Sequence, residues 1–147
     1  MLEELTLEFI IRMILSIFYF VTGSMKLFSL GGFARVLQHY HVFPTILCEV
    51  IAYLLPPLEI TIGVLLFTQS YVLTILTIII LLQLFLTYFT FEALREKGHV
   101  KNSGILGATF DVKLSKLIVA INVLLLAGAG YLLISLKLIV SALTLPL

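Results

Sequence analysis

Long apolar blocks separated by short polar stretches dominate this chain. Four blocks are each long enough to cross a hydrocarbon core of roughly 30 Å as a helix that rises 1.5 Å per residue. They cover about residues 9–28, 46–67, 71–91 and 114–136. A segment in lipid must satisfy its own backbone hydrogen bonds, so even a β-branched run such as TIIILL is expected to be helical. The pattern predicts an all-α fold, a bundle of four transmembrane helices forming a single domain over residues 1–147.

The connections between these blocks differ in length. Only residues 68–70 separate the second and third blocks, which predicts a tight antiparallel hairpin. The other two connections, residues 29–45 and 92–113, are long and polar. Two crossings separate them, so both lie on the same side of the membrane. Loops commonly carry function, and that side is expected to hold specific chemistry or a partner contact.

The apolar tail, residues 137–147, makes the last block too long for one straight crossing. A bend at Gly128-Ala129-Gly130 would accommodate it. We favour the alternative in which Lys137 marks the membrane interface, because lysine commonly extends to the interface at a helix end. The tail would then lie along the surface or against a partner.

The composition supports membrane insertion. Hydrophobic residues make up 61% of the chain and charged residues 12%, about half the usual charged share of soluble domains. A net charge of +1 gives no reason to expect nucleic-acid binding. The single cysteine, Cys48, excludes an internal disulfide and is interpreted as a small apolar core residue. The acidic start MLEELTLE differs from the basic start of a signal peptide, so we expect the first block to be retained.

Basic residues predict the orientation. Arg12 and Lys137 lie near the side that holds the termini, whereas the side with the long connections is richer in basic residues. These are Lys26, Arg35, Arg95, Lys97, Lys101, Lys113 and Lys116. The positive-inside rule places the long connections in the cytoplasm and both termini outside. We therefore expect an integral protein of the cell (inner) membrane of a prokaryote.

Glu59 is a carboxylate inside an apolar block, directly after Pro56-Pro57. A charge at that depth is costly and should have a partner. Glu59 lies about 12 Å from the side of the termini. Arg12 enters the membrane from that side, so an Arg12–Glu59 ion pair is one hypothesis. Such a pair would be either a fixed salt bridge that sets helix register, or a proton relay or ligand anchor. Glu8, four residues before Arg12, competes for the guanidinium.

Gln83 and Asn122 form a second polar pair. Each lies about 12 Å below the side of the long connections, on segments that run antiparallel. The two amides can therefore meet. They would act either as a hydrogen bond between helices or as contacts to a ligand.

Several polar residues gather on the side of the long connections. Lys26, His39, Tyr40 and His41 lie there, together with His99. No spacing typical of metal ligands is present, so these residues are interpreted as solvated interface groups and no metal site is expected. The sequence also has no Ser/His/Asp arrangement, paired carboxylates or phosphate-binding glycine loop.

Short motifs occur in an order that resembles the DoxX/MauE group of small four-helix membrane proteins. An arginine begins the first block, Gly-x-x-Lys-Leu ends it, and Phe-x-x-x-Leu-x-x-Tyr follows. Pro-x-Glu-x-x-x-Gly comes next, and an asparagine lies early in the last block. Here these are Arg12, Gly23-Ser24-Met25-Lys26-Leu27, Phe33 to Tyr40, Pro57 to Gly63, and Asn122.

The resemblance implies a redox motif that this chain does not keep. Many relatives of the methylamine-utilisation type carry Cys-Gly-Cys-Phe-Gly between their third and fourth helices. This chain has Ser103-Gly104-Ile105-Leu106-Gly107 there. A thiolate is the nucleophile in disulfide exchange, and neither Ser103 nor Ile105 can replace it. We expect the turn with Gly104 and Gly107 to persist without the dithiol chemistry.

Two functions follow from the residues and the resemblance. The first is a non-catalytic subunit, or an assembly or redox-associated partner, of a membrane complex. It would lie in the lipid bilayer with a protein partner or a second copy of itself. The alternative resembles the membrane component of thiosulfate:quinone oxidoreductase. In that case Glu59 would exchange protons, and Arg12, Gln83 or Asn122 would bind a quinone oxygen. No other cofactor is evident, and we do not expect the chain to be catalytic alone.

Overall fold

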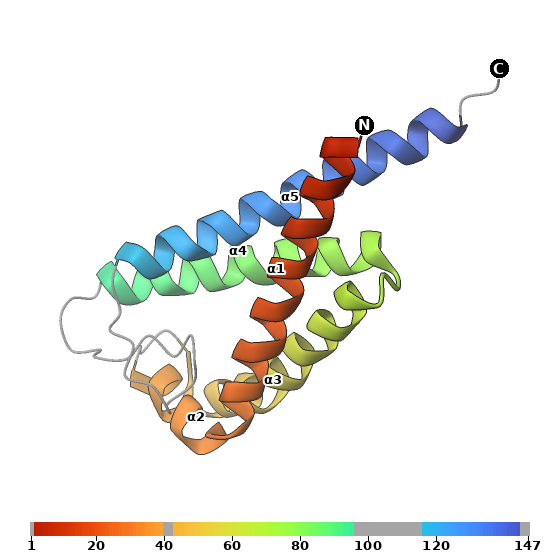
Figure 1. The fold of residues 1–147 in the computed structure, drawn as a ribbon. Coiled ribbons are helices and arrows are strands. Elements are labelled where there is room, and N and C mark those ends of the chain that lie inside the picture. Colours follow the sequence, from red (N-terminus) through yellow and green to blue (C-terminus); the bar gives the residue numbers. More distant parts are fainter. Residues whose placement is uncertain (1, 40–42, 96–115, 145–147) are drawn as a thin grey trace.

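The computed structural model describes residues 2–39, 43–95 and 116–144. Within these ranges the fold consists of α-helices without strands (Figure 1). The helices are α1 (Leu2–Leu27), α2 (Leu30–His39), α3 (Thr45–Phe67), α4 (Val72–Arg95) and α5 (Lys116–Thr144). The predicted all-α class is confirmed.

Four of the described helices are long and apolar enough to cross a membrane. The spans are Leu7–Leu27, Thr45–Phe67, Val72–Glu92 and Ile118–Leu138. Many large apolar side chains on these helices point outward, among them Ile14, Ile17, Leu54 and Leu124. Such a surface is costly in water and favourable in lipid. The protein is therefore a helical membrane bundle, as predicted.

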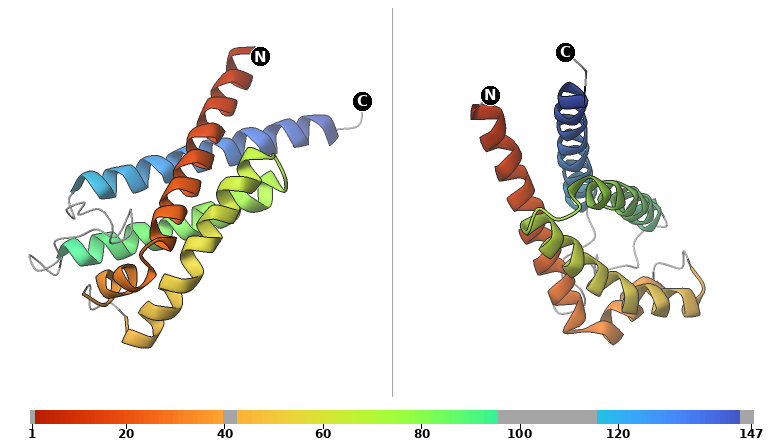
Figure 2. Two further views of the ribbon diagram at one scale, coloured as in Figure 1. Left: turned by 60° about the horizontal axis from the view of Figure 1, so that its bottom comes forward. Right: turned by 90° about the vertical axis from the view of Figure 1, so that its right-hand side faces the viewer.

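The four spans form two antiparallel pairs. Helix α1 packs along α3, and α4 packs along α5 (Figures 1 and 2). The two pairs cross where the middle of α1 meets α5, near the turn between α3 and α4. They separate toward the end of the molecule where α2 lies. Within the first pair, α1 is the helix that contacts α5.

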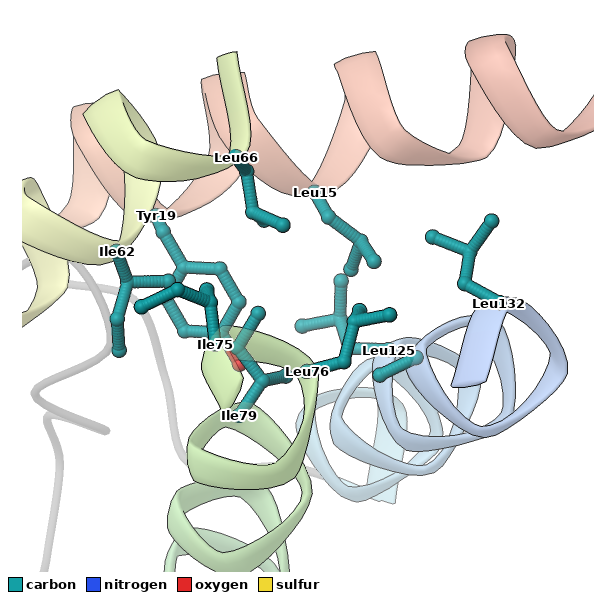
Figure 3. Packing of buried hydrophobic residues seen from close by; sticks show 10 residues of the cluster. Leu15, Tyr19, Ile62, Leu66, Ile75, Leu76, Ile79, Leu125 and Leu132 are labelled. Carbon is teal, nitrogen blue, oxygen red and sulfur yellow. The ribbon is translucent and has the colours of Figure 1, made fainter. Parts of the chain in front are cut away.

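The main core lies at the crossing of the two pairs (Figure 3). Leu15 and Tyr19 of α1 point toward α4 and α5, and Leu66 of α3 closes the same cluster. The other members are Ile62 of α3, Ile75, Leu76 and Ile79 of α4, and Leu125, Ala129 and Leu132 of α5. Dispersion between these close-packed side chains holds the helices together, because lipid supplies no hydrophobic driving force between them.

The first long connection contains a helix that the sequence analysis treated as loop. Helix α2 covers residues 30–39 of the predicted connection 29–45. Its buried face carries Phe33, Ala34 and Leu37. These residues form a second cluster with residues of α3 and with Phe89 of α4. The amphipathic spacing of these three positions outweighs the two glycines in the first turn.

The turn between α3 and α4 and the C-terminal part of α5 can both be compared with their predictions. The turn between α3 and α4 is short, as predicted, and places Gln69 and Tyr71 at φ values of 58° and 52°. The predicted tight antiparallel hairpin of these two spans is wrong, because α3 packs along α1 and α4 packs along α5 instead. Helix α5 is continuous through Gly128, Gly130 and Lys137. It keeps its direction to Thr144 (Figure 1). The bend at the glycines is therefore not formed, and the tail up to residue 144 continues α5 beyond Lys137.

Candidate functional site

Two glycines bring α1 and α3 into unusually close contact. A Cβ atom on Gly23 would lie 2.8 Å from the Pro56 carbonyl oxygen and 2.9 Å from Glu59 Cβ. A Cβ atom on Gly63 would lie 2.8 Å from the Phe20 backbone nitrogen. The Ser16 hydroxyl donates to the Gly63 carbonyl at 2.7 Å across the same interface. Small residues allow such close approach of helices in membranes. Helix α3 runs through Pro56 and Pro57 without interruption.

A buried ion pair lies directly beside this contact. Lys26 Nζ donates to both carboxylate oxygens of Glu59, at 2.5 Å and 2.7 Å. Lys26 is 4% exposed and Glu59 is 2% exposed. The ammonium also lies 5.5 Å from the centre of the Phe33 ring, which attracts a cation through its π face. The buried ion pair therefore joins α1 to α3, with α2 covering it.

The hypothesis of an Arg12–Glu59 pair is wrong. The Arg12 guanidinium lies at the other end of α1, against the side-chain amide of Gln69. With the amide turned so that its oxygen faces the guanidinium, that oxygen accepts from Nη2 at 2.7 Å and from Nη1 at 3.2 Å. Glu8 does not take the guanidinium either, because its carboxylate accepts from the Ser135 hydroxyl. Lys26, interpreted from the sequence as a solvated interface residue, fills the place that Arg12 was expected to fill.

The predicted contact of Gln83 with Asn122 is confirmed. Gln83 Nε2 donates to the side-chain oxygen of Asn122 at 3.0 Å and to its backbone oxygen at 3.1 Å. Tyr19 donates its hydroxyl to Gln83 Oε1 at 2.9 Å. Asn122 Nδ2 donates to Thr90 Oγ1 at 3.3 Å. We call these four residues the amide network. All four are buried, and the network joins α1, α4 and α5.

The remaining predicted site residues are placed only in part. His39 is exposed at the end of α2, and its Nδ1 lies 2.6 Å from the Arg35 carbonyl oxygen. The other candidates lie outside the described residues: Tyr40, His41, Ser103, Gly104, Ile105 and Gly107.

Sequence reasoning missed Lys26 because lysines near helix ends usually extend outward to the interface. One signal was present. Gly23 and Lys26 are three residues apart and therefore share a helix face. A face that brings a neighbouring helix close at Gly23 also presents Lys26 to that neighbour. Tyr19 and Thr90 carried no such signal, because a lone hydroxyl in an apolar block is common.

The arrangement satisfies its own polar groups. Both oxygens of Glu59 are occupied by the Lys26 ammonium. The Gln83 side chain uses both its oxygen and its nitrogen inside the amide network. In lipid, such interactions replace those that water would supply. The geometry therefore suits fixing the helices in register.

A comparison with protein families finds a match over nearly the whole chain. Residues 5–143 match the family described as Methylamine utilisation protein MauE. Neither the curated proteins nor the solved structures contain a match to this chain. The matched region includes all four spans, the buried ion pair and the amide network. The chain therefore belongs to the methylamine utilisation protein MauE family.

Proposed function

We propose that this protein is a non-catalytic membrane subunit, or an assembly partner, of a redox-associated membrane complex. The observation that carries the proposal is that the polar side chains of the buried ion pair and of the amide network form their hydrogen bonds with one another. Polar groups held in this way stabilise a scaffold and leave little capacity for binding a substrate. Membership of a family named for methylamine utilisation supports a role in a membrane complex that serves such a pathway.

The contacts of Glu59 do not favour the quinone-linked alternative. That alternative requires Glu59 to exchange protons with a bound quinone. The carboxylate is 2% exposed, and Lys26 Nζ lies 2.5 Å and 2.7 Å from its two oxygens. A proton carrier needs a path to water or to its partner, and here the Lys26 ammonium closes off both oxygens of the carboxylate.

We further propose that the partner contacts the side of the molecule where α2 lies, and that this side faces the cytoplasm. Helix α2 buries its apolar face and leaves Arg35 and His39 exposed. Lys26 is neutralised by Glu59, but Arg35, Arg95 and the basic residues of 96–116 still favour a cytoplasmic location. An exposed arginine is suited to an acidic group on a partner.

The test is purification in a mild detergent followed by mass spectrometry of proteins and small molecules. We expect a second membrane or membrane-associated chain in fixed stoichiometry, and no quinone. Arg35→Glu should lower recovery of that chain several-fold, because it reverses a charge at the proposed contact. Thr68→Glu is the matched control on the opposite side of the membrane and should leave recovery unchanged.

Two outcomes would contradict the proposal. Recovery of the chain alone, or only as copies of itself, would remove the partner. A co-purified quinone whose absorbance change on reduction is lost in Glu59→Gln would favour the quinone-linked alternative.

A further inference from the structure

A cavity lies at the end of the bundle opposite α2. Its volume is about 350 Å³, at the lower end of the range for small-molecule sites. Residues from α1, from the turn between α3 and α4, from α4 and from α5 line it: Glu8, Phe9, Arg12, Gln69, Val72, Leu132 and Leu136. Neither the buried ion pair nor the amide network reaches this cavity.

The cavity holds one cation and one anion that do not pair with each other. Glu8 and Arg12 are four residues apart on α1, a spacing at which such charges usually meet. Here each is drawn to a different element. Arg12 bonds the Gln69 side chain in the turn, and Glu8 bonds the Ser135 hydroxyl of α5. Among the described residues no carboxylate lies within ion-pair distance of Arg12.

The guanidinium of Arg12 keeps unused hydrogen-bonding capacity. It lies over the Phe9 ring, with the guanidinium carbon 5.5 Å from the ring centre. Gln69 occupies one donor on each of Nη1 and Nη2, and the buried Nε has no partner. A guanidinium has five N–H donors and matches a phosphate well. A partly buried cation with free donors is therefore suited to an anionic group.

The position of the cavity selects the class of ligand. Glu8 and Arg12 lie in the first turns of the span Leu7–Leu27, and Gln69 lies between two spans. Leu132 and Leu136 belong to the last turns of the span Ile118–Leu138. All these positions fall at the boundary between hydrocarbon and water on one side of the membrane. Polar and apolar side chains meet there, as the polar headgroup and the apolar acyl chains meet in a phospholipid.

We propose that this cavity binds the headgroup of an ethanolamine phospholipid. The phosphate lies at Arg12, the primary ammonium lies at Glu8, and the acyl chains leave along the apolar wall formed by Val72 and Leu136. One positive and one negative protein charge complement the two opposite charges of this headgroup. A purely anionic headgroup would leave Glu8 facing like charge. A choline headgroup would bring no N–H donor to the carboxylate.

The test is lipid selection by the reconstituted protein. The protein is placed in vesicles of equal parts phosphatidylethanolamine, phosphatidylglycerol and phosphatidylcholine, re-extracted gently, and its retained lipid is measured by native mass spectrometry. We expect enrichment of phosphatidylethanolamine over both other lipids by about tenfold, the effect of one charge-assisted hydrogen bond. Arg12→Gln should remove the enrichment. Glu8→Gln should abolish the preference over phosphatidylcholine while lipid is still retained, since glutamine can still accept from Ser135.

Arg35→Gln is the matched control, because it removes an exposed arginine on α2 without touching the cavity. It should retain phosphatidylethanolamine as the unchanged protein does.

Soluble phosphoethanolamine distinguishes a free headgroup from a lipid, and it should fail to displace the retained lipid. Equal retention of the three lipids by the unchanged protein would overturn the proposal. So would selection that survives Glu8→Gln, or displacement by phosphoethanolamine. Unfolding midpoints show whether Arg12→Gln is folded; if it is not, Glu8→Gln decides alone.

Discussion

The ion pair of Lys26 with Glu59 is the contact at which a single substitution should most affect the stability of this bundle. Both side chains are almost fully buried. Among the described residues, Glu59 is the only carboxylate paired with Lys26, and Lys26 is the only cation paired with Glu59. Removing one partner leaves a charge in a medium of low dielectric constant, whereas removing both leaves no charge to solvate. The pair is therefore more sensitive to single than to double substitution.

We expect Glu59→Gln and Lys26→Met each to lower the free energy of unfolding by about 3–5 kcal/mol. The double variant should lose clearly less than the sum of the two. The measurement is denaturant unfolding in a fixed detergent, read as a double-mutant cycle.

The surface pair between exposed Arg95 and half-buried Glu92 serves as the control, with its closest atoms 3.4 Å apart at the end of α4. Glu92→Gln should change the free energy of unfolding by less than about 1 kcal/mol, because an exposed pair is screened by water. Additive losses in the Lys26–Glu59 cycle would show that the two charges are not coupled.

Depth along the chain predicted one of the two polar contacts correctly. Gln83 and Asn122 lie equally deep on antiparallel segments, and their amides meet. The same reasoning failed for Glu59. It compared backbone depths and assigned the nearest arginine, whereas a lysine side chain from the other end of α1 reaches inward along a helix that lies unusually close. Side-chain reach and helix separation are tertiary properties that spacing alone does not contain.

At the level of the helices, Gly23 and Gly63 set the distance between α1 and α3. An added methyl group would meet backbone atoms at 2.8 Å at both positions. Backbone cannot move aside as the end of a flexible side chain can. Gly130 of α5 has nothing within 4 Å of such a methyl group, so it offers a comparison within the same chain.

Gly23→Ala and Gly63→Ala should each lower the free energy of unfolding by about 1–3 kcal/mol, because they overpack the helix interface. Gly130→Ala should leave it unchanged or raise it by up to about 1 kcal/mol, since alanine is the better helix former. Thermal unfolding of the three variants in one detergent measures the difference. Losses of similar size at all three positions would mean that close approach is not the cause.

Helix α2 is the element that the sequence pattern does not predict. A connection with two adjacent glycines and two histidines is typical of a loop, and its composition predicts one. The spacing of Phe33, Ala34 and Leu37 suits one helix face, but the block is too short and too polar to stand out beside the membrane spans. Its stability comes from contacts with α3 and with Phe89, which are distant in sequence.

For the whole molecule, hydrophobic blocks were sufficient to predict the four crossings, because lipid imposes helical structure on any spanning segment. They could not predict which helices pair. The pairing of α1 with α3 depends on Gly23 and Gly63, and the pairing of α4 with α5 includes the amide network. Both depend on small or polar residues that a hydropathy pattern treats as interruptions.

Orientation in the membrane is also a property of the whole molecule, and the chain is well suited to measuring it. Its one cysteine, Cys48, is fully buried, so it should give a low background with a membrane-impermeant maleimide. Arg35 and Thr68 are both exposed; Arg35 lies on α2, before the span α3, and Thr68 directly follows that span, so the two lie on opposite sides of the membrane. The excess of basic residues around α2 predicts that Arg35→Cys is protected in intact cells and that Thr68→Cys is labelled.

Permeabilised cells should label both variants, which confirms that each introduced thiol is reactive. Labelling of Arg35→Cys but not of Thr68→Cys in intact cells would reverse the orientation. It would then place the α2 side, and any partner bound there, outside the cytoplasm.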